Sequence, residues 1–230
     1  MHVNVLIVED DPLVERVLAQ CLSTRGFTLH LVRTGKDALK KARQLNPDAI
    51  ILDLGLPDIP GSDVIRALHQ DPGSRHIPIL VLTGTSRDHQ ELELLSGGAD
   101  DFVTKPFDVE VLAARVQNLV HRARSISAEV KLLQKGGLLL DPRNRIVRWK
   151  ESDAAALSPK EFDILFLLAK DSPNVVDRNS IATRVWGQPV DEIHPRAIDV
   201  HIRWIRMKLA ENASIKIEAV SRKGYRLTFC

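Results

Sequence analysis

Polar side chains stand where the apolar, strand-length segments in the first half of the chain end, and this pattern constrains the fold strongly. The segments 3–8 and 49–53 both run into acidic residues, and the segment 79–83 ends in a hydroxyl. The polar residues at these ends are Glu9, Asp10, Asp11, Asp53, Thr83 and Lys105. In an open parallel sheet, the carboxyl ends of the strands line the crevice in which ligands bind. We therefore predict that these side chains converge on one pocket.

Strand-like and helix-like segments alternate from residue 3 to residue 122. The expected strands cover residues 3–8, 28–32, 49–53, 79–83 and 101–104, and the expected helices cover about 12–24, 35–46, 61–70, 87–96 and 108–122. The first helix, for example, shows helical spacing at Leu13, Val17 and Cys21. Five strands that alternate with five helices predict an α/β domain with a doubly wound, five-stranded parallel sheet.

The pattern changes after the first half of the chain. Residues 124–135 are basic and small polar with weak periodicity, and Gly136 and Gly137 follow them. We predict domains at 1–123 and 136–230, joined by a linker at 124–135. The second domain is expected to be α+β, with strands at 138–140 and 146–149, a turn at 142–144, helices at about 158–170, 179–185 and 195–210, and a hairpin at 215–229. The first of these helices opens with a capping box formed by Ser158 and Glu161.

Composition narrows the class of protein. The chain has 230 residues, and 44% of them are hydrophobic, which is enough for two ordinary domains. Its apolar runs are far shorter than the roughly 20 residues that span a bilayer, and the acids from Glu9 onward argue against a secretory signal. A soluble, cytoplasmic protein is expected. Cys21 and Cys230 have neither metal-ligand spacing nor a disulfide framework.

The net charge of +2 is divided unevenly along the chain. Residues 1–124 hold 14 Lys and Arg against 17 Asp and Glu, whereas residues 125–230 hold 18 against 13, so the two parts carry −3 and +5. Between Arg196 and Arg226, eight basic residues face three acidic ones. This excess favours a polyanionic partner. A solvated basic face explains the charge alone about as well.

The acids at the strand ends point to phosphoryl chemistry. Several neighbouring carboxylates either raise a pKa or bind a cation, and ligands made only of oxygen suit Mg²⁺. Asp53 would then act as a nucleophile toward a phosphoryl donor, while Lys105 pairs with the anion and Thr83 hydrogen-bonds it. The alternative is that acids at strand ends cap helices, and Asp11 before Pro12 fits that role.

These residues make the segment 1–123 resemble the receiver domain of a two-component response regulator, which has a flavodoxin-like fold. The resemblance implies that Asp53 accepts a phosphoryl group from a sensor histidine kinase. It implies that Mg²⁺ is held by Glu9, Asp10, Asp53 and the backbone carbonyl of Gly55. It also assigns Thr83 and Phe102 as switch residues and Lys105 as the phosphate-contacting amine, before a proline at Pro106 that is usually cis. Every one of these positions is suitably occupied.

A phosphatase with an aspartyl-phosphate intermediate, like the haloacid dehalogenase-like enzymes, is the rival interpretation. Such enzymes need a second acid two residues after the nucleophile, where this chain has Gly55. Without that general acid and base, turnover of external substrates is not expected. The chain is therefore expected not to be an enzyme, although the resemblance implies slow self-dephosphorylation.

The segment 196–209 predicts a helix with two different faces. Ile198, Ile202, Ile205 and Leu209 form an apolar stripe, and Arg196, Val200, Arg203 and Met207 lie roughly opposite. Such a helix can enter the major groove, where Arg reads guanine and apolar side chains meet thymine methyl groups. An ordinary amphipathic surface helix is the alternative.

The flanking motifs make residues 131–230 resemble the winged-helix DNA-binding domain of the OmpR/PhoB family. The matching residues are Leu157, Ser158, Glu161, Trp186, Arg196, Ile198, Asp199, Val200, His201, Ile202, Arg203, Arg206, Lys208, Leu209, Gly224, Tyr225 and Arg226. The resemblance implies double-stranded DNA contacts by Arg196, Val200, His201, Arg203 and Arg206. It places Tyr225 in support of the wing and the loop from Trp186 to His194 against RNA polymerase.

The chain departs from the family at the expected DNA surface. Trp204 stands where relatives often have a basic residue, and Ser221 replaces a frequent wing Arg. Trp204 is expected either to meet DNA or to cover the hairpin. Arg222 and Lys223 are candidates for a minor-groove contact because of their charge and position.

The resemblance also implies a homodimer on activation. Asp100, Asp101, Arg115 and Arg122 fit two of the family's intermolecular ion pairs, whereas Glu91 and Val111 occupy the third. Two copies on tandem sites would gain avidity. The expected function is a transcription regulator switched by phosphorylation of Asp53. The alternatives are a regulator that dimerises and binds DNA regardless of phosphorylation, and a protein-interaction module.

Overall fold

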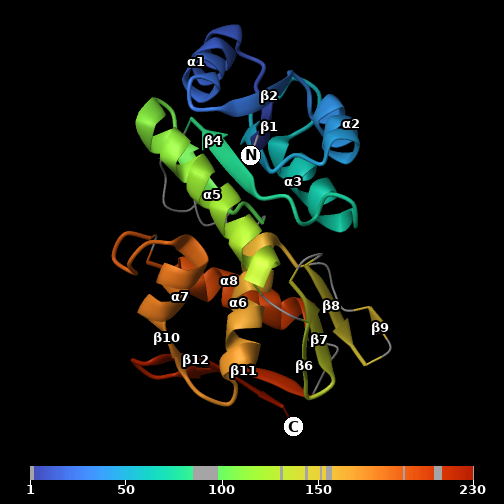
Figure 1. The fold of residues 1–230 in the computed structure, drawn as a ribbon, viewed down its shortest axis with the longest axis vertical. Helices are drawn as coiled ribbons and strands as arrows, with labels where there is room; N and C mark the ends of the chain where they lie inside the picture. The colour runs from blue at the N-terminus through green and yellow to red at the C-terminus, as the bar shows by residue number, and fades with distance from the viewer. Residues whose placement is uncertain are drawn as a thin grey trace. The chain divides into compact units, whose positions relative to one another are not determined.

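The structure, a computed structural model, describes residues 3–84, 98–129, 132–142, 145–150, 152–153, 157–193, 195–209 and 214–229. At residues 122–129 and 152–153 the description covers the backbone only. The chain divides into two compact units, Met1–Ala123 and Arg124–Cys230 (Figure 1).

The first unit is built on a five-stranded parallel sheet with the strand order β2-β1-β3-β4-β5. The strands are β1 (Val3–Val8), β2 (Phe27–Val32), β3 (Ala49–Asp53), β4 (Ile79–Thr83) and β5 (Asp101–Thr104). The sheet and its five strands were predicted from the sequence and are confirmed. Because all five strands are parallel, their carboxyl ends share one edge of the sheet.

Helices cover both faces of this sheet (Figure 1). The helices are α1 (Pro12–Ser23), α2 (Gly35–Leu45), α3 (Gly61–Gln70) and α5 (Val109–Glu129). Buried side chains of α1 and α5 share one apolar cluster with the sheet, and those of α2 and α3 share the other. The helix expected at 87–96 lies outside the described residues. The rest of the doubly wound pattern agrees with the prediction.

Helix α1 forms where it was predicted, and its side chains differ in burial. Leu13 is 70% exposed and Val17 is 47% exposed, whereas Leu18 and Leu22 are fully buried against the sheet. The helix carries two overlapping apolar stripes, and only one of them packs on the sheet. The spacing of Leu13 and Val17 thus identified the helix correctly, although these two side chains are exposed.

The segment expected to be a linker contains regular structure. Helix α5 continues to Glu129, seven residues beyond its expected end, and strand β6 (Leu133–Lys135) follows it. Residues 124–135 contain neither Gly nor Pro, so the first strong breakers after the helix start are Gly136 and Gly137. Weak apolar periodicity was therefore a poor guide to where this helix ends.

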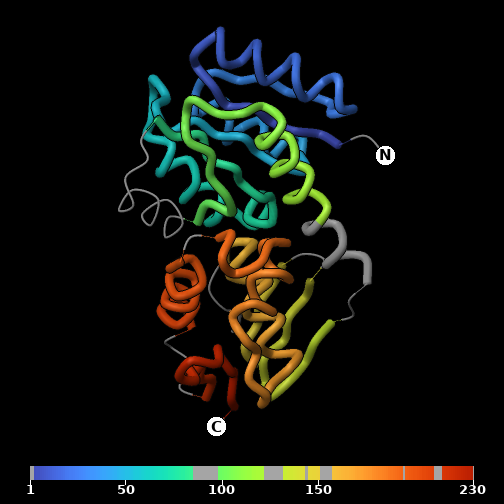
Figure 2. The backbone as a smooth tube through the Cα atoms, turned by 90° about the vertical axis from the view of Figure 1, so that its left-hand side faces the viewer, coloured from blue at the N-terminus to red at the C-terminus, as the bar shows by residue number. Residues whose placement is uncertain are grey.

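The described residues of the second unit form antiparallel sheets and the helices α6, α7 and α8 (Figure 1), and Figure 2 shows the course of their backbone from another side. One sheet has the order β6-β7-β8-β9, with β7 (Leu138–Asp141), β8 (Ile146–Trp149) and β9 (Ser152–Asp153). The other has the order β10-β12-β11, with β10 (Val176–Asp177), β11 (Ile215–Val220) and β12 (Gly224–Phe229). The helices are α6 (Pro159–Asp171), α7 (Arg178–Trp186) and α8 (Ala197–Lys208). The predicted strands, helices and hairpin are present, while β6, β9 and β10 were missed.

Strand β10 joins the hairpin because Gly224 lets it approach closely. Val176 pairs with Tyr225, and Asp177 pairs with Gly224 itself. A Cβ atom built on Gly224 would collide with the backbone carbonyl of Val176. A two-residue strand carries almost no periodicity, which explains why β10 escaped the sequence analysis.

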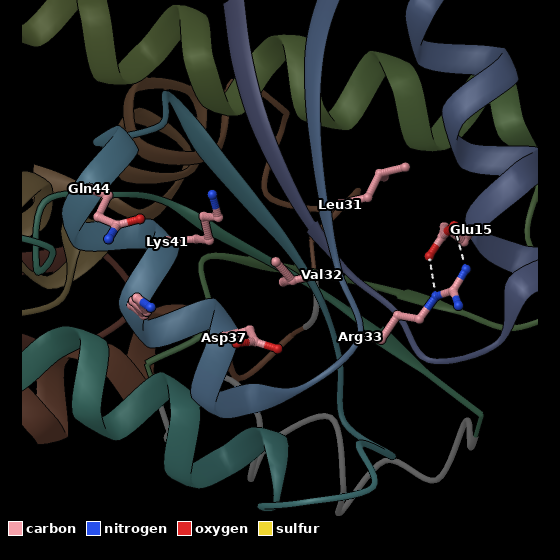
Figure 3. A pocket seen from close by; sticks show the side chains of 8 residues that line it. Glu15, Leu31, Val32, Arg33, Asp37, Lys41 and Gln44 are labelled. Carbon is pink, nitrogen blue, oxygen red and sulfur yellow. Dashed lines mark hydrogen bonds and ion pairs between the residues drawn. The ribbon is translucent and has the colours of Figure 1, made fainter.

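An open groove lies beside edge strand β2 (Figure 3) and has a volume of about 600 Å³. It is lined by Glu15, Leu31, Val32, Arg33, Asp37, Lys40, Lys41 and Gln44. Arg33 pairs with Glu15 at 2.9 Å, and the lining carries both signs of charge. Its lining includes none of the acids Glu9, Asp10 and Asp53 that were predicted to converge. Among the described residues, no helix is both long and apolar enough to cross a membrane.

Candidate functional site

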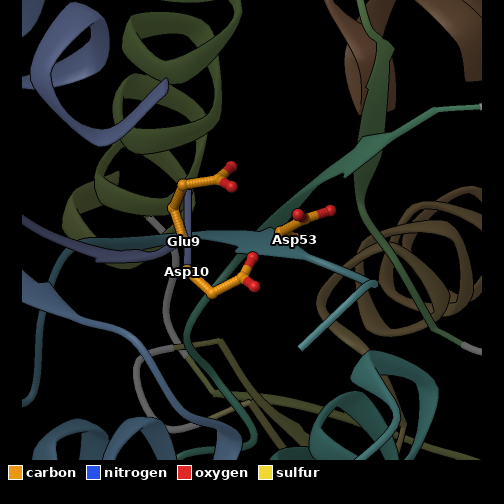
Figure 4. Close-up of side chains that lie close together, drawn as sticks. All are labelled: Glu9, Asp10 and Asp53. Atoms are coloured by element: carbon orange, nitrogen blue, oxygen red, sulfur yellow. The ribbon is translucent and has the colours of Figure 1, made fainter. Parts of the chain in front are cut away.

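Three acids meet at the carboxyl edge of the parallel sheet. Val8 lies beside Leu52 in the pairing of β1 with β3, so the residues that follow these two positions emerge next to each other. Carboxylate oxygens of Glu9, Asp10 and Asp53 all lie within 4.8 Å of one another (Figure 4). The convergence predicted from strand ends is thus present for these acids.

Lys105 completes the cluster from the loop that follows β5. Its Nζ atom donates to Glu9 Oε2 at 2.8 Å and to Asp53 Oδ2 at 2.9 Å. The backbone N–H of Lys105 also donates to the carbonyl of Thr83, which fixes the start of this loop to β4. The peptide bond from Lys105 to Pro106 is cis, as the sequence resemblance implied.

Burial and charge act against each other in this cluster. Glu9 is fully buried, and burial raises its pKa above the usual value, with the nearby charge of Asp53 adding to the effect. Lys105 counteracts this through its hydrogen bond to Glu9. For Lys105 itself, burial disfavours the charged form, yet the hydrogen bonds to Glu9 and Asp53 raise its pKa. One ammonium group therefore offsets two carboxylates, and the cluster keeps an excess of negative charge.

This donor set fits a hard divalent cation. The cluster offers carboxylate oxygens from Glu9, Asp10 and Asp53 within the span of one ion, and Mg²⁺ takes one or two carboxylates with waters and phosphate oxygens. Burial is the main cause of the raised pKa of Glu9, and a cation would offset the smaller contribution from the charge of Asp53. Gly55 follows β3 by two residues, on the loop that leaves this edge of the sheet.

The remaining residues predicted for the pocket sit on neighbouring strands. Thr83 ends β4 and is buried, and Phe102 lies in β5 against the apolar cluster beneath α2 and α3. Asp11 caps α1 instead, because its carboxylate accepts from the backbone N–H of Leu13 at 2.8 Å. The helix-capping interpretation is therefore right for Asp11.

Helix α8 in the second unit has the two faces that its sequence predicted. The apolar stripe is buried and consists of Ile198, Ile202, Ile205 and Leu209. Arg196, Arg203, Arg206 and Met207 are exposed, and Val200 is half-buried. Met207 and Arg203 give the outer face both apolar and basic character. This face is the candidate nucleic-acid surface.

His201 is a correction to the predicted set of DNA contacts. Its side chain is fully buried, with its ring 5.5 Å from the ring of Trp186. Burial and the charges of Lys160 and Lys208 lower its pKa from 6.5 to about 3, so the imidazole is neutral. A side chain inside the core cannot touch DNA. On the helix, His201 stands directly before Ile202 and shares the buried face.

Trp186 and Arg206 also differ from their expected settings, whereas Trp204 fits either of the two alternatives predicted for it. Trp186, expected on a loop facing RNA polymerase, is buried, and the Nζ atom of Lys160 lies 4.5 Å from its ring centroid. Trp204 is half-buried. Arg206 donates through Nε and Nη2 to the carbonyl of Ile217 at 3.0 and 2.7 Å, so it fastens α8 to β11.

The tip of the hairpin carries exposed positive charge. Arg222 and Lys223 are exposed in the turn between β11 and β12, with Arg222 at a φ of 57°. Tyr225 is buried, and its hydroxyl donates to Asp199 in α8. Tyr225 therefore supports the hairpin from within rather than presenting its ring to a ligand.

The residues expected at a dimer interface fall into three groups. Asp100 is buried, and its carboxylate accepts from the backbone N–H of Ile79 at 2.8 Å, which corrects the expectation of an exposed pair. Arg115 donates to both carboxylate oxygens of Asp101 at 3.0 Å within the same chain. Glu91 and the side chain of Arg122 lie outside the described part of the chain.

Sequence analysis missed two residues that organise these sites. Asp58 accepts from the backbone N–H groups of Gly35 and Lys36 at 2.7 and 3.0 Å, which joins the loop after β3 to the start of α2. Arg178 at the start of α7 pairs with Asp199 in α8. Both contacts join residues more than 20 positions apart, so no local spacing in the sequence predicts them.

Two families match separate parts of this chain. Residues 5–117 match the family described as Response regulator receiver domain. Residues 152–227 match the family described as Transcriptional regulatory protein, C terminal. The first match contains the acidic cluster with Lys105, and the second contains α8 and all but the last two residues of the hairpin.

Relatives match the chain over most of its length. The DNA-binding response regulator MtrA of Mycolicibacterium smegmatis is 34% identical over 215 residues, which cover 92% of this chain and 90% of that protein. The response regulator ArlR of Staphylococcus epidermidis is 32% identical over 223 residues, which cover 96% and 98%. The DNA-binding dual master transcriptional regulator RpaA of Synechocystis sp. is 35% identical over 213 residues, which cover 91% and 87%.

Solved structures resemble the chain over its full length. A RitR mutant has a TM-score of 0.83 at 25% identity, with 99% of this chain and 100% of that chain covered. The response regulator DrrB of Thermotoga maritima, described as an OmpR/PhoB homolog, has a TM-score of 0.51 at 29% identity, with 99% and 100% covered.

Proposed function

Since this chain belongs to the OmpR/PhoB family of two-component response regulators, we propose that phosphoryl transfer to Asp53 switches its binding to DNA. The chain combines a receiver domain with a DNA-binding domain of the kind that regulates transcription. The observation that carries the proposal is the pocket at the sheet edge. There, three carboxylates gather within 4.8 Å, and Lys105 bonds to two of them.

Asp53 is the proposed phosphoryl acceptor. Its side chain keeps 13% of its surface exposed, whereas Glu9 has none, so Asp53 is the more accessible of these two acids. A carboxylate oxygen of Asp53 bonds to the phosphorus of a phosphohistidine on a sensor kinase. The phosphorus–nitrogen bond breaks, and its electron pair returns to the imidazole. Lys105, already 2.9 Å from Asp53, offsets charge on the transferred group.

The cation is proposed to be Mg²⁺, held by Glu9, Asp10, Asp53 and the backbone carbonyl of Gly55. When bound, it neutralises charge on the phosphoryl oxygens during transfer. Thr83 is the proposed hydrogen-bond donor to the new phosphoryl group. Phe102, packed against the core beside it, is proposed to change its packing with Thr83, so that phosphorylation shifts a population of conformations.

DNA binding is proposed to use α8 and the tip of the hairpin. Arg196, Val200 and Arg203 are the proposed major-groove contacts, because they lie on the outer face of α8. Arg222 and Lys223 are the proposed backbone or minor-groove contacts at the hairpin turn. Arg206 and Tyr225 are assigned supporting roles, in line with their bonds to Ile217 and Asp199.

Phosphorylation is proposed to promote a homodimer on tandem sites. Asp101 and Arg115 pair within one chain, and we propose that they exchange partners across the dimer. Individual exposed pairs contribute little, about 0 to 1 kcal/mol, so most of the gain comes from linking two DNA-binding domains. The loop at 187–193 is the proposed contact with RNA polymerase.

The deciding experiment selects DNA from a random pool with the wild type and with Asp53→Asn. Each protein is used with and without a small-molecule phosphodonor and Mg²⁺, and intact mass records phosphoryl incorporation. We expect the wild type to gain one phosphoryl group and to enrich a direct repeat more strongly afterwards. Asp53→Asn should gain none and should give the same enrichment in both conditions.

Two outcomes would contradict the proposal in different ways. Equal enrichment in all four samples would mean that DNA binding ignores the receiver domain, as in a regulator that dimerises independently of phosphate. Incorporation by Asp53→Asn would mean that another residue accepts the phosphoryl group. Omission of Mg²⁺ should suppress incorporation in the wild type, which tests the cation separately.

A further inference from the structure

The start of α8, like that of α3, lacks the side-chain cap that α1, α2, α6 and α7 have. Asp11, Thr34, Ser158 and Asp177 each accept a backbone N–H at the start of α1, α2, α6 and α7. At α8 the N-cap residue is Arg196, and no side chain caps the first turn. Uncapped first turns leave backbone donors without helical partners. The start of the proposed recognition helix therefore depends on other contacts.

Arg178, at the start of α7, holds the start of α8 through acceptor groups and leaves the free backbone donors unchanged. Its guanidinium donates to both oxygens of Asp199 at 2.8 and 3.1 Å, in the bidentate geometry that makes such pairs strong. It also reaches the carbonyl of Pro195 at 3.4 Å, just before α8. One side chain thus holds both the first turn of α8 and the segment that leads into it.

Tyr225 connects the same carboxylate to the hairpin. Its hydroxyl donates to Asp199 Oδ1, and the guanidinium of Arg178 lies 5.8 Å from the centroid of its ring. Tyr225 is itself fixed in β12, where it pairs with Val176 on one side and Ala219 on the other. Asp199 is therefore the point at which α7, α8 and the hairpin sheet are joined.

A carboxylate at the position of Asp199 is unfavourable for DNA binding unless other side chains engage it. Its side chain is 48% exposed and stands in the first turn of α8, next to the basic face proposed to meet DNA phosphates. A lone carboxylate there would repel DNA. Arg178 and Tyr225 engage it instead, and their hydrogen bonds hold its pKa below the usual value although burial alone raises it.

We infer that Asp199 is a positioning residue for DNA recognition, which acts through Arg178 and Tyr225. The three side chains fix the orientation of α8 relative to the hairpin. The helix and the hairpin tip can therefore contact the same DNA site together. This inference rests on the proposed DNA-binding function. Asp199 then joins the residues that DNA recognition needs. Its removal should weaken sequence recognition, whereas charge alone predicts that removing a carboxylate strengthens DNA binding.

The test measures the affinity of the full-length protein for its selected site and for a scrambled duplex, over a series of salt concentrations. Asp199→Asn removes one negative charge and the bidentate pairing. We expect affinity for the selected site to fall about tenfold, the scale for losing a hydrogen bond to a charged group. Affinity for the scrambled duplex should stay equal or rise, because the protein becomes more positive.

Asp191→Asn is the matched control, since Asp191 is exposed on the loop between α7 and α8. It removes the same charge and should not weaken either affinity. Tyr225→Phe keeps the ring and deletes the hydroxyl. Like Asp199→Asn, it should lower the preference for the selected site over the scrambled duplex. In the double variant Arg178→Met with Asp199→Asn, the loss should not exceed that of the larger single variant, because the two residues act as one unit.

The outcomes separate this inference from the proposed function. If the wild type prefers its selected site and Asp199→Asn keeps that preference, the positioning role is wrong and the proposed function stands. A loss of both affinities in Asp199→Asn would indicate an unfolded domain and would also contradict the inference. A wild type without any sequence preference would overturn the proposed function and the inference together.

Discussion

At the scale of single residues, His201 differs most from what its place in the sequence predicts. It belongs to a motif that resembles DNA-contacting residues, yet it is buried against Trp186 with a pKa lowered from 6.5 to about 3 by burial and by Lys160 and Lys208. The unfolded chain gains this proton near pH 6.5, whereas the folded domain resists it until about pH 3. Stability from this group is thus present above pH 6.5 and is lost as the pH falls.

We expect the free energy of unfolding of the second domain to decrease by about 1.4 kcal/mol per pH unit on account of His201 below pH 6. All three tryptophans, Trp149, Trp186 and Trp204, lie in this domain, so their fluorescence reports its unfolding by urea. His201→Phe should show a shallower pH dependence than the wild type by about one proton. His30→Phe, in strand β2 of the first domain, should leave the fluorescence transition unchanged at every pH. Equal slopes in His201→Phe and wild type would contradict this assignment.

At the scale of secondary structure, α6 begins with a capping box that the sequence announced. The hydroxyl of Ser158 accepts from the N–H of Glu161, and Glu161 accepts in turn from the N–H of Ser158 at 2.7 Å. Glu161 also pairs with Lys208 at 2.6 Å, which joins the start of α6 to the end of α8. Both capping residues are buried, so water cannot replace the lost bond.

Ser158→Ala should therefore lower the unfolding free energy of the second domain by about 1 to 2 kcal/mol. Thr34 caps α2 in the first domain in a similar way, and Thr34→Ala is the matched control. Urea unfolding followed by tryptophan fluorescence should shift for Ser158→Ala and not for Thr34→Ala. A shift in both variants would mean that the two domains unfold as one unit.

Helix α1 shows that apolar periodicity predicts a helix without predicting which of its faces is buried. Its sequence carries one apolar stripe through Leu13 and Val17 and another through Leu18 and Leu22. Both have helical spacing, so periodicity predicts the helix and cannot choose between its faces. The buried face depends on packing against the sheet and α5, because Leu18 and Leu22 lie in the cluster that contains Leu112.

At the scale of the whole molecule, the proposed switch predicts how DNA affinity depends on the spacing of two half-sites. Lengthening the selected repeat by about 5 base pairs turns one half-site to the opposite face of the duplex, and lengthening it by about 10 returns it. The phosphorylated wild type should bind the first variant more weakly and the second more tightly again. Affinity that is independent of spacing in a binding assay would show that each copy binds alone.

The sequence by itself determined the alternation of strands and helices in the first unit and the acids at the strand ends. These features follow from local order along the chain, because a parallel sheet gathers its carboxyl edges whatever the details of packing. Glu9, Asp10, Asp53 and Lys105 meet for this reason, and the meeting could be predicted.

Only the tertiary structure decided which side chains face inward and which distant residues join. It placed His201 and Trp186 in the core and buried Asp100 beneath β4. It also brought Arg178 to Asp199 across 21 positions. Spacing along a helix records which residues share a face, whereas burial and long-range pairing depend on the neighbours that folding brings to that face.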